Sequence, residues 1–275
     1  MENIIYSMKR EMLRRRLSRR TIESYIFCIK KFLSCVRKQP RKITKKDVKN
    51  YLDDLAERNK SGSTINVYLS AIRFLLEEVL HRNVNLNFRY SKRPGSLPTV
   101  LSKEEVKRLF DVIRNPKHKL MIELLYSAGM RVSELLNLRG RDFEIRIGHG
   151  WIRKGKGNKD RPFIIADRLK EELLIYIKEN NLTPNDYLFS RNKFFPMHTR
   201  TIQEIVKKAA KNAKIMKHIH PHTLRHSFAT HLIQDGYKIA DVQPLLGHSR
   251  LDTTMVYVHL ASAELLSVKS PFDNL

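Results

Sequence analysis

The sequence predicts a mainly α-helical protein built from two lobes, the second of which contains a small antiparallel β-meander. Apolar residues recur at helical spacing through residues 1–88 and again through most of residues 100–275. Between them, residues 89–99 are rich in Pro, Gly, Ser and basic side chains, which is typical of a linker between domains. From about Asp142 to Ile165, the helical spacing gives way to short β-prone runs.

The first lobe is predicted to contain four helices. The third begins at Thr44, whose side chain can accept from first-turn amides and forms a capping box with Asp47. The fourth follows the helix-breaking run Ser61-Gly62-Ser63. The apolar positions that define the four stripes are Ile4, Ile5, Met8 and Met12; Ile22, Tyr25, Ile26, Ile29, Phe32 and Leu33; Val48, Tyr51, Leu52 and Leu55; and Ile65, Tyr68, Leu69, Ile72, Leu75 and Leu76.

The second lobe begins with another predicted capping box, Ser102 with Glu105, which leads into a helix. A further helix breaks at Gly129, and helical spacing returns from Asp167 onward. The β-prone runs of the meander are Phe143-Glu144-Ile145, Trp151-Ile152 and Phe163-Ile164-Ile165. A C-terminal tail from about Ala261 contains a short apolar patch, which we expect to dock either on its own lobe or on a neighbouring copy.

The charge of the chain indicates a polyanionic partner. Lys and Arg number 53 and Asp and Glu number 28, so the net charge is +25. Nucleic acid is the usual partner of a protein with such a one-sided excess. The alternative is the charged surface of a thermophile, but such surfaces gain both signs in order to build ion-pair networks. Basic runs at predicted helix ends, such as Arg14–Arg16 and Arg41–Lys42, could contact phosphates, the alternative being an ordinary solvated face.

The sequence also predicts a cytoplasmic protein. No apolar run approaches the about 20 residues that a membrane-spanning helix needs, and the N-terminus lacks the apolar core of a secretory signal. Cys28 and Cys35 lie seven residues apart in one helical pattern, about 10 Å at the helical rise, which is too far for a disulfide. Both are expected to be buried thiols in a reducing compartment.

Two local patterns in the second lobe place cations where an anion could bind. Arg131 stands at a predicted helix start, where backbone amides favour anions, and Glu134 is spaced to hold its guanidinium. The alternative is an ordinary surface ion pair. Lys156 lies in the Gly-rich turn of the predicted hairpin, from which it can reach a ligand. The spacing is not that of a P-loop, and an ordinary polar turn is the alternative.

A third pattern pairs a titratable group with a permanent cation. His222 and Arg225 are three residues apart and so share one face of a helix that Pro221 is suited to start. This pairing can polarise a phosphate while moving a proton. A metal site is the alternative, because His220 and His226 lie close by. Arg225 would repel a metal cation, however, and no carboxylate or Cys completes a ligand set. His220 and His226 are therefore expected to pack in the fold or face solvent.

The fourth pattern surrounds the end of a predicted helix. Gly247 is placed to end that helix in the left-handed conformation, which exposes His248 just beyond it. Tyr257 follows on the next predicted helix. As one of ten tyrosines, it could equally be half buried with a bonded hydroxyl.

Taken in order, these residues resemble the catalytic set of the tyrosine recombinases of the phage-integrase family. The matching residues are Arg131, Lys156, His222, Arg225, His248 and Tyr257. The surrounding sequence motifs also match those of the family: Gly-Met-Arg-Val-Ser-Glu-Leu, Gly-Lys-Gly-Asn-Lys and Leu-Leu-Gly-His. In the first lobe, Leu17–Tyr25 resembles the core-binding domain of the family. The compact length resembles the Xer branch, and abundant Lys, Arg and Ile with few Gln would suit an archaeal, thermophilic member.

The resemblance implies a two-lobed clamp around DNA. Residues 1–88 would form the core-binding domain, and residues 100–275 the catalytic domain. The partners would be double-stranded DNA with a specific recombination site and three further copies, making a homotetramer on two duplexes. The Xer role would be to resolve chromosome dimers. Other possibilities are a phage- or mobile-element integrase, a type IB topoisomerase that relaxes supercoils, and a DNA-packaging protein without chemistry.

The resemblance also implies a role for each matching residue. Tyr257 would attack the phosphodiester and leave a 3′-phosphotyrosyl link, which stores the bond energy without ATP. His222 is the candidate to accept the phenol proton, because a phenol of pKa about 10 is un-ionised at neutral pH. Lys156 would protonate the departing 5′-oxygen. The phosphate charge would be met by Arg131, Arg225 and His248. No cofactor or metal is expected, because the arginines supply the charge that Mg²⁺ would supply.

Overall fold

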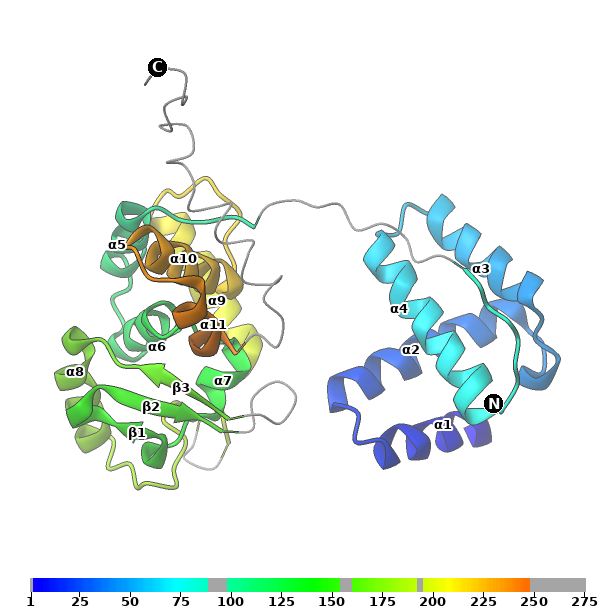
Figure 1. Ribbon diagram of the computed structural model, residues 1–275, viewed down its shortest axis with the longest axis horizontal. Helices are drawn as coiled ribbons and strands as arrows, with labels where there is room; N and C mark the ends of the chain where they lie inside the picture. Colours follow the sequence, from blue (N-terminus) through cyan, green and yellow to red (C-terminus); the bar gives the residue numbers. More distant parts are fainter. Residues whose placement is uncertain (1, 89–97, 154–159, 192–194, 248–275) are drawn as a thin grey trace, which may run out of the picture. The chain divides into compact units, whose positions relative to one another are not determined.

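The computed structural model describes residues 2–88, 98–153, 160–191 and 195–247. The chain divides into two compact units, Met1–Gly95 and Ser96–Leu275 (Figure 1). Both are mainly helical, and the second contains one three-stranded antiparallel sheet, so the predicted fold class is confirmed. Most of the predicted linker, residues 89–97, lies outside the described residues.

The described residues of the first unit contain four α-helices, as the apolar stripes predict. They are α1 (Glu2–Arg14), α2 (Arg19–Val36), α3 (Lys45–Glu57) and α4 (Gly62–Arg73). Each of the last three begins at a hydroxyl cap: Ser18 accepts from the Thr21 amide, Ser61 caps α4, and Thr44 forms the predicted capping box with Asp47. A short 3₁₀ turn (Pro40–Lys42) precedes α3, and α4 continues into the π-helix η2 (Phe74–Val79).

The core of the first unit contains most of the predicted stripes, together with residues outside them such as Ile43 and Leu86. Met8, Met12, Phe32 and Ile72 are fully buried. One expectation was wrong: Cys28 is buried, but Cys35 is exposed. Cys35 stands in the last turn of α2, where it borders an open groove instead of the packed core. Periodicity alone places it on the same side of the helix as Cys28.

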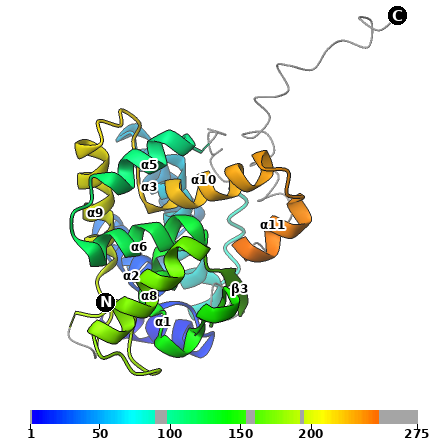
Figure 2. The same ribbon diagram turned by 90° about the vertical axis from the view of Figure 1, so that its left-hand side faces the viewer.

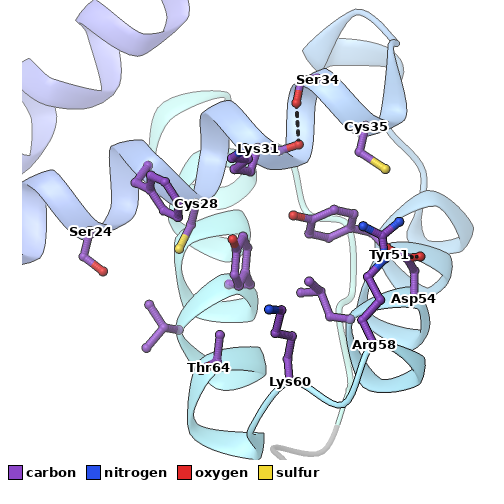
Figure 3. A pocket seen from close by; sticks show the side chains of 14 residues that line it. Ser24, Cys28, Lys31, Ser34, Cys35, Tyr51, Asp54, Arg58, Lys60 and Thr64 are labelled. Carbon is purple, nitrogen blue, oxygen red and sulfur yellow. Dashed lines mark hydrogen bonds and ion pairs between the residues drawn. The ribbon is translucent and has the colours of Figure 1, made fainter.

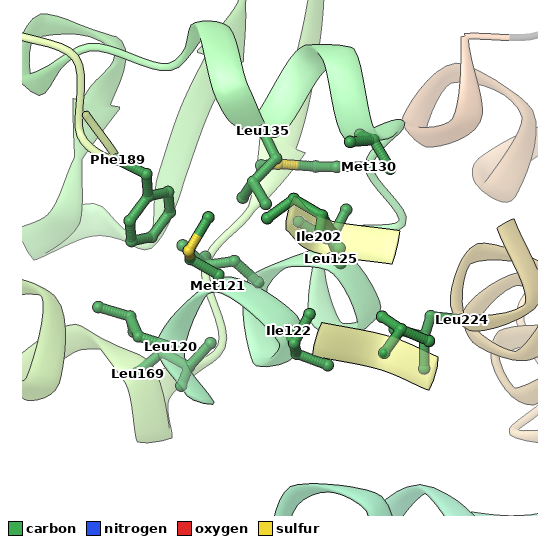
Figure 4. Close-up of a cluster of buried hydrophobic side chains, with 14 of the residues drawn as sticks. Leu120, Met121, Ile122, Leu125, Met130, Leu135, Leu169, Phe189, Ile202 and Leu224 are labelled. Atoms are coloured by element: carbon green, nitrogen blue, oxygen red, sulfur yellow. The ribbon is translucent and has the colours of Figure 1, made fainter. Parts of the chain in front are cut away.

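The second unit surrounds one buried helix, α6 (Pro116–Ser127). Residues Leu120, Met121, Ile122, Leu124 and Leu125 of this helix are all buried and form a wide apolar face, whereas Lys119 and Glu123 pair on its partly exposed side. The helices that contact it are α5 (Lys103–Asp111), α7 (Val132–Asn137), α8 (Asp167–Glu179), α9 (Thr199–Asn212) and α10 (Pro221–Gln234). Figure 4 shows side chains of α6 packing with Leu135, Phe189, Ile202 and Leu224, which come from four other parts of this unit.

The predicted meander is present as a sheet of order β1-β2-β3. Its strands are β1 (Phe143–Glu144), β2 (His149–Ile152) and β3 (Arg161–Ile164). In β3 the side chains alternate, so Arg161 and Phe163 are buried while Pro162 and Ile164 are partly exposed. The first residue of β3 thus points a charged side chain inward.

Helix α11 (Ile239–Leu246) contacts both α10 and β3 (Figure 2). Val242 and Leu246 of α11 pack on Phe228 and Ala229 of α10. This contact brings the end of α11 close to the start of β3. Among the described residues, no helix is long and apolar enough to cross a membrane.

Candidate active site

Three of the six predicted catalytic residues lie in the described part of the second unit. Arg131 directly precedes α7, and His222 and Arg225 lie on the first turns of α10. The other three, Lys156, His248 and Tyr257, lie outside the described residues, as does the tail from Ala261. In sequence, Lys156 falls between β2 and β3, and His248 directly follows Gly247.

Arg131 is held by Glu134 through both its backbone and its side chain. The backbone N–H of Arg131 donates to Glu134 Oε2 over 2.8 Å, and its Nη1 donates to Oε1 over 2.6 Å. The side chain of Glu134 is only 4% exposed, so this is not the exposed surface pair that the sequence left open. A buried, two-point contact restricts the guanidinium far more than a pair in water does.

Arg225 is anchored by backbone carbonyls from two other segments. Its Nη1 donates to the carbonyl of Gly129 over 2.6 Å, and its Nη2 donates to the carbonyl of Leu246. The side chain is 3% exposed. Gly129 adopts a φ of +54°, and a Cβ there would lie 2.4 Å from the ring of Phe228. This glycine therefore permits the close approach of the loop before α7 to α10.

The structure adds Arg161, which sequence reasoning did not single out. Its Nη2 donates to Glu134 Oε2 over 2.6 Å, and its Nη1 donates to the carbonyl of Leu245. A sequence signal for it existed: Arg161 alternates with the apolar Phe163 and Ile165 in a β-prone run, which places a charge on the inward face of a strand. We call Arg131, Arg161, Arg225 and Glu134 the arginine cluster.

The end of α11 meets all three arginines of the cluster. The consecutive carbonyls of Leu245, Leu246 and Gly247 accept from Arg161, Arg225 and Arg131 respectively, the last over 3.4 Å. Gly247 has φ 60° and ψ 44°, the left-handed conformation that the sequence predicts for it. The last carbonyls of a helix lack partners inside the helix and mark the negative end of its dipole, so cations stabilise them.

Charge in the cluster is unbalanced. Three guanidinium groups surround one carboxylate among the described residues. Burial alone would raise the pKa of Glu134, but the hydrogen bond from Arg161 and the charges of Arg161 and Arg131 outweigh burial and lower it. Glu134 therefore stays ionised, and an excess of positive charge remains for an anion such as a phosphate.

His222 lies beside the cluster in a form suited to accept a proton. Partial burial lowers the pKa of its imidazole, and the charges of His220, Arg225 and Arg131 lower it further. It is therefore neutral at pH 7, which a base must be. The predictions for His220 and His226 agree with the structure: His220 is exposed, and burial lowers the pKa of His226 to about 4. Among the described residues, no group of three or more His, Cys, Asp or Glu side chains is placed to hold a metal ion.

A separate groove of about 760 Å³ lies in the first unit (Figure 3). Its lining comes from α2, α3, the turn that follows α3, and α4, and includes Cys28, Tyr51, Arg58 and Thr64. None of the predicted catalytic residues lines it. The groove is therefore distinct from the arginine cluster.

Comparisons with known proteins identify the family of the chain. The model of the phage integrase family matches residues 99–264, and that of the phage integrase N-terminal SAM-like domain matches residues 4–86. A tyrosine recombinase of Thermosipho africanus is 36% identical over 91% of this chain and 92% of its own length. The tyrosine recombinase XerA of Pyrococcus horikoshii is 34% identical, covering 90% of this chain and 86% of its own.

Solved structures resemble the whole chain as well. A crystal structure of XerA recombinase covers 97% of this chain and 96% of its own, with 32% identity and a TM-score of 0.57. A XerH site-specific recombinase bound to a palindromic difH substrate, in a post-cleavage complex, covers 92% of this chain and 80% of its own, with 26% identity and a TM-score of 0.76. The chain therefore belongs to the phage integrase family and is a tyrosine recombinase of the Xer type, an enzyme that cleaves and rejoins DNA strands.

Proposed function

We propose that this chain recombines double-stranded DNA at a specific site through a covalent intermediate on Tyr257. The observation that carries the proposal is the arginine cluster, in which buried guanidinium groups outnumber the single carboxylate. Positive charge fixed in place before the reaction stabilises the extra negative charge of a pentavalent phosphorus. The site is therefore chemically matched to phosphoryl transfer.

Each predicted residue has a defined role in this proposal. Tyr257 attacks the phosphorus and forms a 3′-phosphotyrosyl bond as the 5′-oxygen departs. His222 accepts the phenol proton, which its lowered pKa permits at neutral pH. Lys156 gives a proton to the departing 5′-oxygen. The non-bridging oxygens are bound by Arg131, Arg225 and His248. Neither ATP nor a metal ion is needed, since the phosphotyrosine conserves the bond energy and the arginines supply the charge.

We further propose that residues 1–88 are a core-binding domain and residues 100–275 the catalytic domain, joined by residues 89–99 to clamp the duplex. The excess positive charge supports this arrangement. In the first unit, Arg16, Arg20, Arg41 and Lys42 are all exposed at helix ends or turns, where they can contact successive phosphates. The XerH relative is described as bound to a palindromic site, and we extend site-specific DNA binding to this chain.

In the cell we propose that four copies assemble on two duplexes and resolve chromosome dimers before cell division, in the cytoplasm. The support is that relatives of the chain are named tyrosine recombinases, among them XerD, XerC and XerA proteins. The test of this role is a plasmid that carries two copies of the DNA sequence recovered from the covalent adduct on Tyr257. Resolution to monomers by the purified enzyme is expected, whereas relaxation of supercoils without resolution would indicate topoisomerase activity instead.

The chemistry is tested with Tyr257→Phe on a nicked suicide substrate. The wild-type enzyme should form a covalent protein–DNA adduct on a denaturing gel, and the Phe variant should form none while binding DNA as tightly. Tyr237→Phe is the matched control, because Tyr237 is an exposed tyrosine of the same unit and its change should leave the adduct intact. Adduct formation by Tyr257→Phe, or loss of cleavage in EDTA, would contradict the proposal.

A further inference from the structure

Arg161 connects two parts of the active site without belonging to the predicted catalytic set. Its side chain is 6% exposed, and the guanidinium donates to Glu134 of α7 and to the carbonyl of Leu245 in α11. These partners lie 27 and 84 residues away in sequence. Arg161 is the first residue of β3. Its side chain therefore connects β3 to α7 and to α11.

We propose that Arg161 is a positioning residue for strand cleavage, which holds Glu134 in the orientation that presents Arg131 to the scissile phosphate. The inference rests on the proposed function, since it assigns Arg161 a part in the same reaction. Arg161 need not touch DNA in this role. It acts through Glu134 on Arg131.

The two oxygens of the Glu134 carboxylate accept from different donors, which supports this role. Oε1 accepts from the Arg131 side chain, whereas Oε2 accepts from the Arg131 backbone and from Arg161. Arg225 Nη1 lies only 3.8 Å from the same Oε2. Arg161 therefore competes with Arg225 for this oxygen and keeps the carboxylate turned so that Oε1 faces Arg131. Without Arg161, the carboxylate would rotate toward Arg225, and Arg131 would lose its side-chain anchor.

The second contact of Arg161 acts on the end of α11. The carbonyl of Leu245 accepts from Arg161 two residues before Gly247, and a Cβ on Gly247 would lie 2.7 Å from Cδ of Arg161. The glycine and the arginine thus pack directly against each other. Because His248 follows Gly247 in sequence, a shift of Arg161 would also displace the backbone from which His248 departs.

A purely structural ion pair is the competing explanation for these contacts. Buried pairs often contribute little net stability, so burial alone does not distinguish the two roles. The positioning role makes a separate demand: the cleavage rate must fall with no matching loss of stability or DNA binding, and the fall must depend on Arg131.

The experiment compares Arg161→Met, Arg161→Lys and the control Arg153→Met. Arg153 is a half-exposed arginine that follows β2 and pairs with Asp142. Its replacement tests the loss of an arginine near the sheet that does not contact Glu134. Single-turnover cleavage of a nicked substrate is measured at saturating enzyme, with DNA binding by mobility shift. Unfolding is followed by the fluorescence of Trp151, the only tryptophan, which lies in the second unit.

We expect Arg161→Met to slow cleavage on the order of 100-fold, the size of effect that a small misplacement of a reacting group produces. Arg161→Lys should unfold near the wild-type temperature yet still cleave slowly, because an ammonium cannot span Glu134 and Leu245 as a planar fork does. Arg153→Met should cleave at the wild-type rate. Native-rate cleavage by Arg161→Lys would overturn the proposal and would do so even if Arg161→Met failed to fold.

A double variant then tests whether Arg161 affects the cleavage rate through Arg131. If Arg161 acts through Arg131, Arg131→Ala combined with Arg161→Lys should cleave no more than about threefold slower than Arg131→Ala alone, since the two changes remove one shared interaction. Full multiplication of the two losses would refute action through Arg131. Cleavage by the wild-type enzyme is the reference in both assays, so absence of any wild-type adduct would count against the proposed function and not against Arg161.

Discussion

The side chain of His231 joins α10 to the first residues of the second unit, with its Nε2 atom 2.9 Å from the carbonyl oxygen of Leu101. A carbonyl only accepts, so Nε2 carries the proton and Nδ1 accepts from the Tyr126 hydroxyl 2.8 Å away. One turn earlier, the Ser227 hydroxyl accepts from the backbone N–H of Leu101 over 2.9 Å. Both backbone polar groups of Leu101 are thereby bonded to α10, the helix that carries His222 and Arg225.

His231→Ala should destabilise the second unit by about 2–4 kcal/mol, because it leaves the Tyr126 hydroxyl and the Leu101 carbonyl buried without their partner. Urea unfolding followed by Trp151 fluorescence measures the change. His218→Ala is the control, since His218 is exposed and its loss should change stability by less than about 0.5 kcal/mol. Equal stability of the two variants would show that this connection does not stabilise the fold.

Two glycines with positive φ allow the cost of backbone strain to be distinguished from the cost of overpacking. Gly236 follows α10, and Gly247 ends α11. Gly236 has φ +92° and nothing within 4 Å of the position that a Cβ would take, whereas a Cβ on Gly247, at φ +60°, would meet Arg161. Gly236→Ala should cost about 1 kcal/mol from strain alone. Gly247→Ala should cost about 2–4 kcal/mol and also slow cleavage, because overpacking adds to the strain and displaces Arg161. If both variants lost the same free energy of unfolding in urea, the Arg161 side chain would be moving aside without cost.

The cleavage rate should depend on pH through His222. Its pKa is lowered from the ordinary value of 6.5, so the base form dominates at neutral pH and is lost as the pH falls through the lowered value. The second-order rate constant at limiting enzyme should therefore have an acidic limb with a midpoint below pH 6.5. His222→Gln should be slow and lack this limb, while His218→Gln should keep it. A limb unchanged in His222→Gln would assign the base elsewhere.

Lys156→Ala should be rescued by a substrate whose leaving group needs no proton. A 5′-bridging phosphorothiolate provides such a group, because a thiolate departs without general-acid help. The Lys156 variant should regain most of the wild-type rate on it. Arg131→Ala and Arg225→Ala should remain about 100-fold or more slower, since each lacks a charge stabiliser and not an acid. Rescue of the arginine variants instead would show that the acid is misassigned.

Deletion of the chain from Ala261 tests the role of the tail. From the sequence we expect the tail to dock on its own lobe or on a neighbouring copy of the chain. If the tail links neighbouring copies, the truncated enzyme should bind a single site normally but fail to form the synaptic complex of two duplexes. Mobility shift and strand-exchange assays measure both steps. Recombination at the native rate by the truncated enzyme would limit the tail to capping its own lobe.

Local patterns in the sequence were enough to predict most of the fold. The capping boxes Thr44–Asp47 and Ser102–Glu105 both form, because each needs only residues within one helical turn. The contact of Arg131 with Glu134 was predictable for the same reason. The exposure of Cys35 was not, because periodicity defines a face of a helix but not how far along it the neighbouring helices extend.

Contacts between distant segments account for what the sequence did not reveal. The role of Arg161 depends on Glu134 and on a backbone carbonyl of α11, and neither is visible from its own neighbours in the chain. The alternation of Arg161 with buried apolar residues indicates only that the charge points inward. Which partners it meets there depends on how α11 packs on α10 and β3.

The three carbonyls at the end of α11 are also the last parts of the arginine cluster to be synthesised. The ribosome makes Arg131, Arg161 and Arg225 before it makes residues 245–247, whose carbonyls accept from all three side chains. A nascent chain therefore contains every arginine of the cluster but not the backbone groups that hold them in place. A chain that ends before residue 245 would therefore hold the positive charge of the cluster without the carbonyls that orient it, and it would also lack Tyr257, the proposed nucleophile.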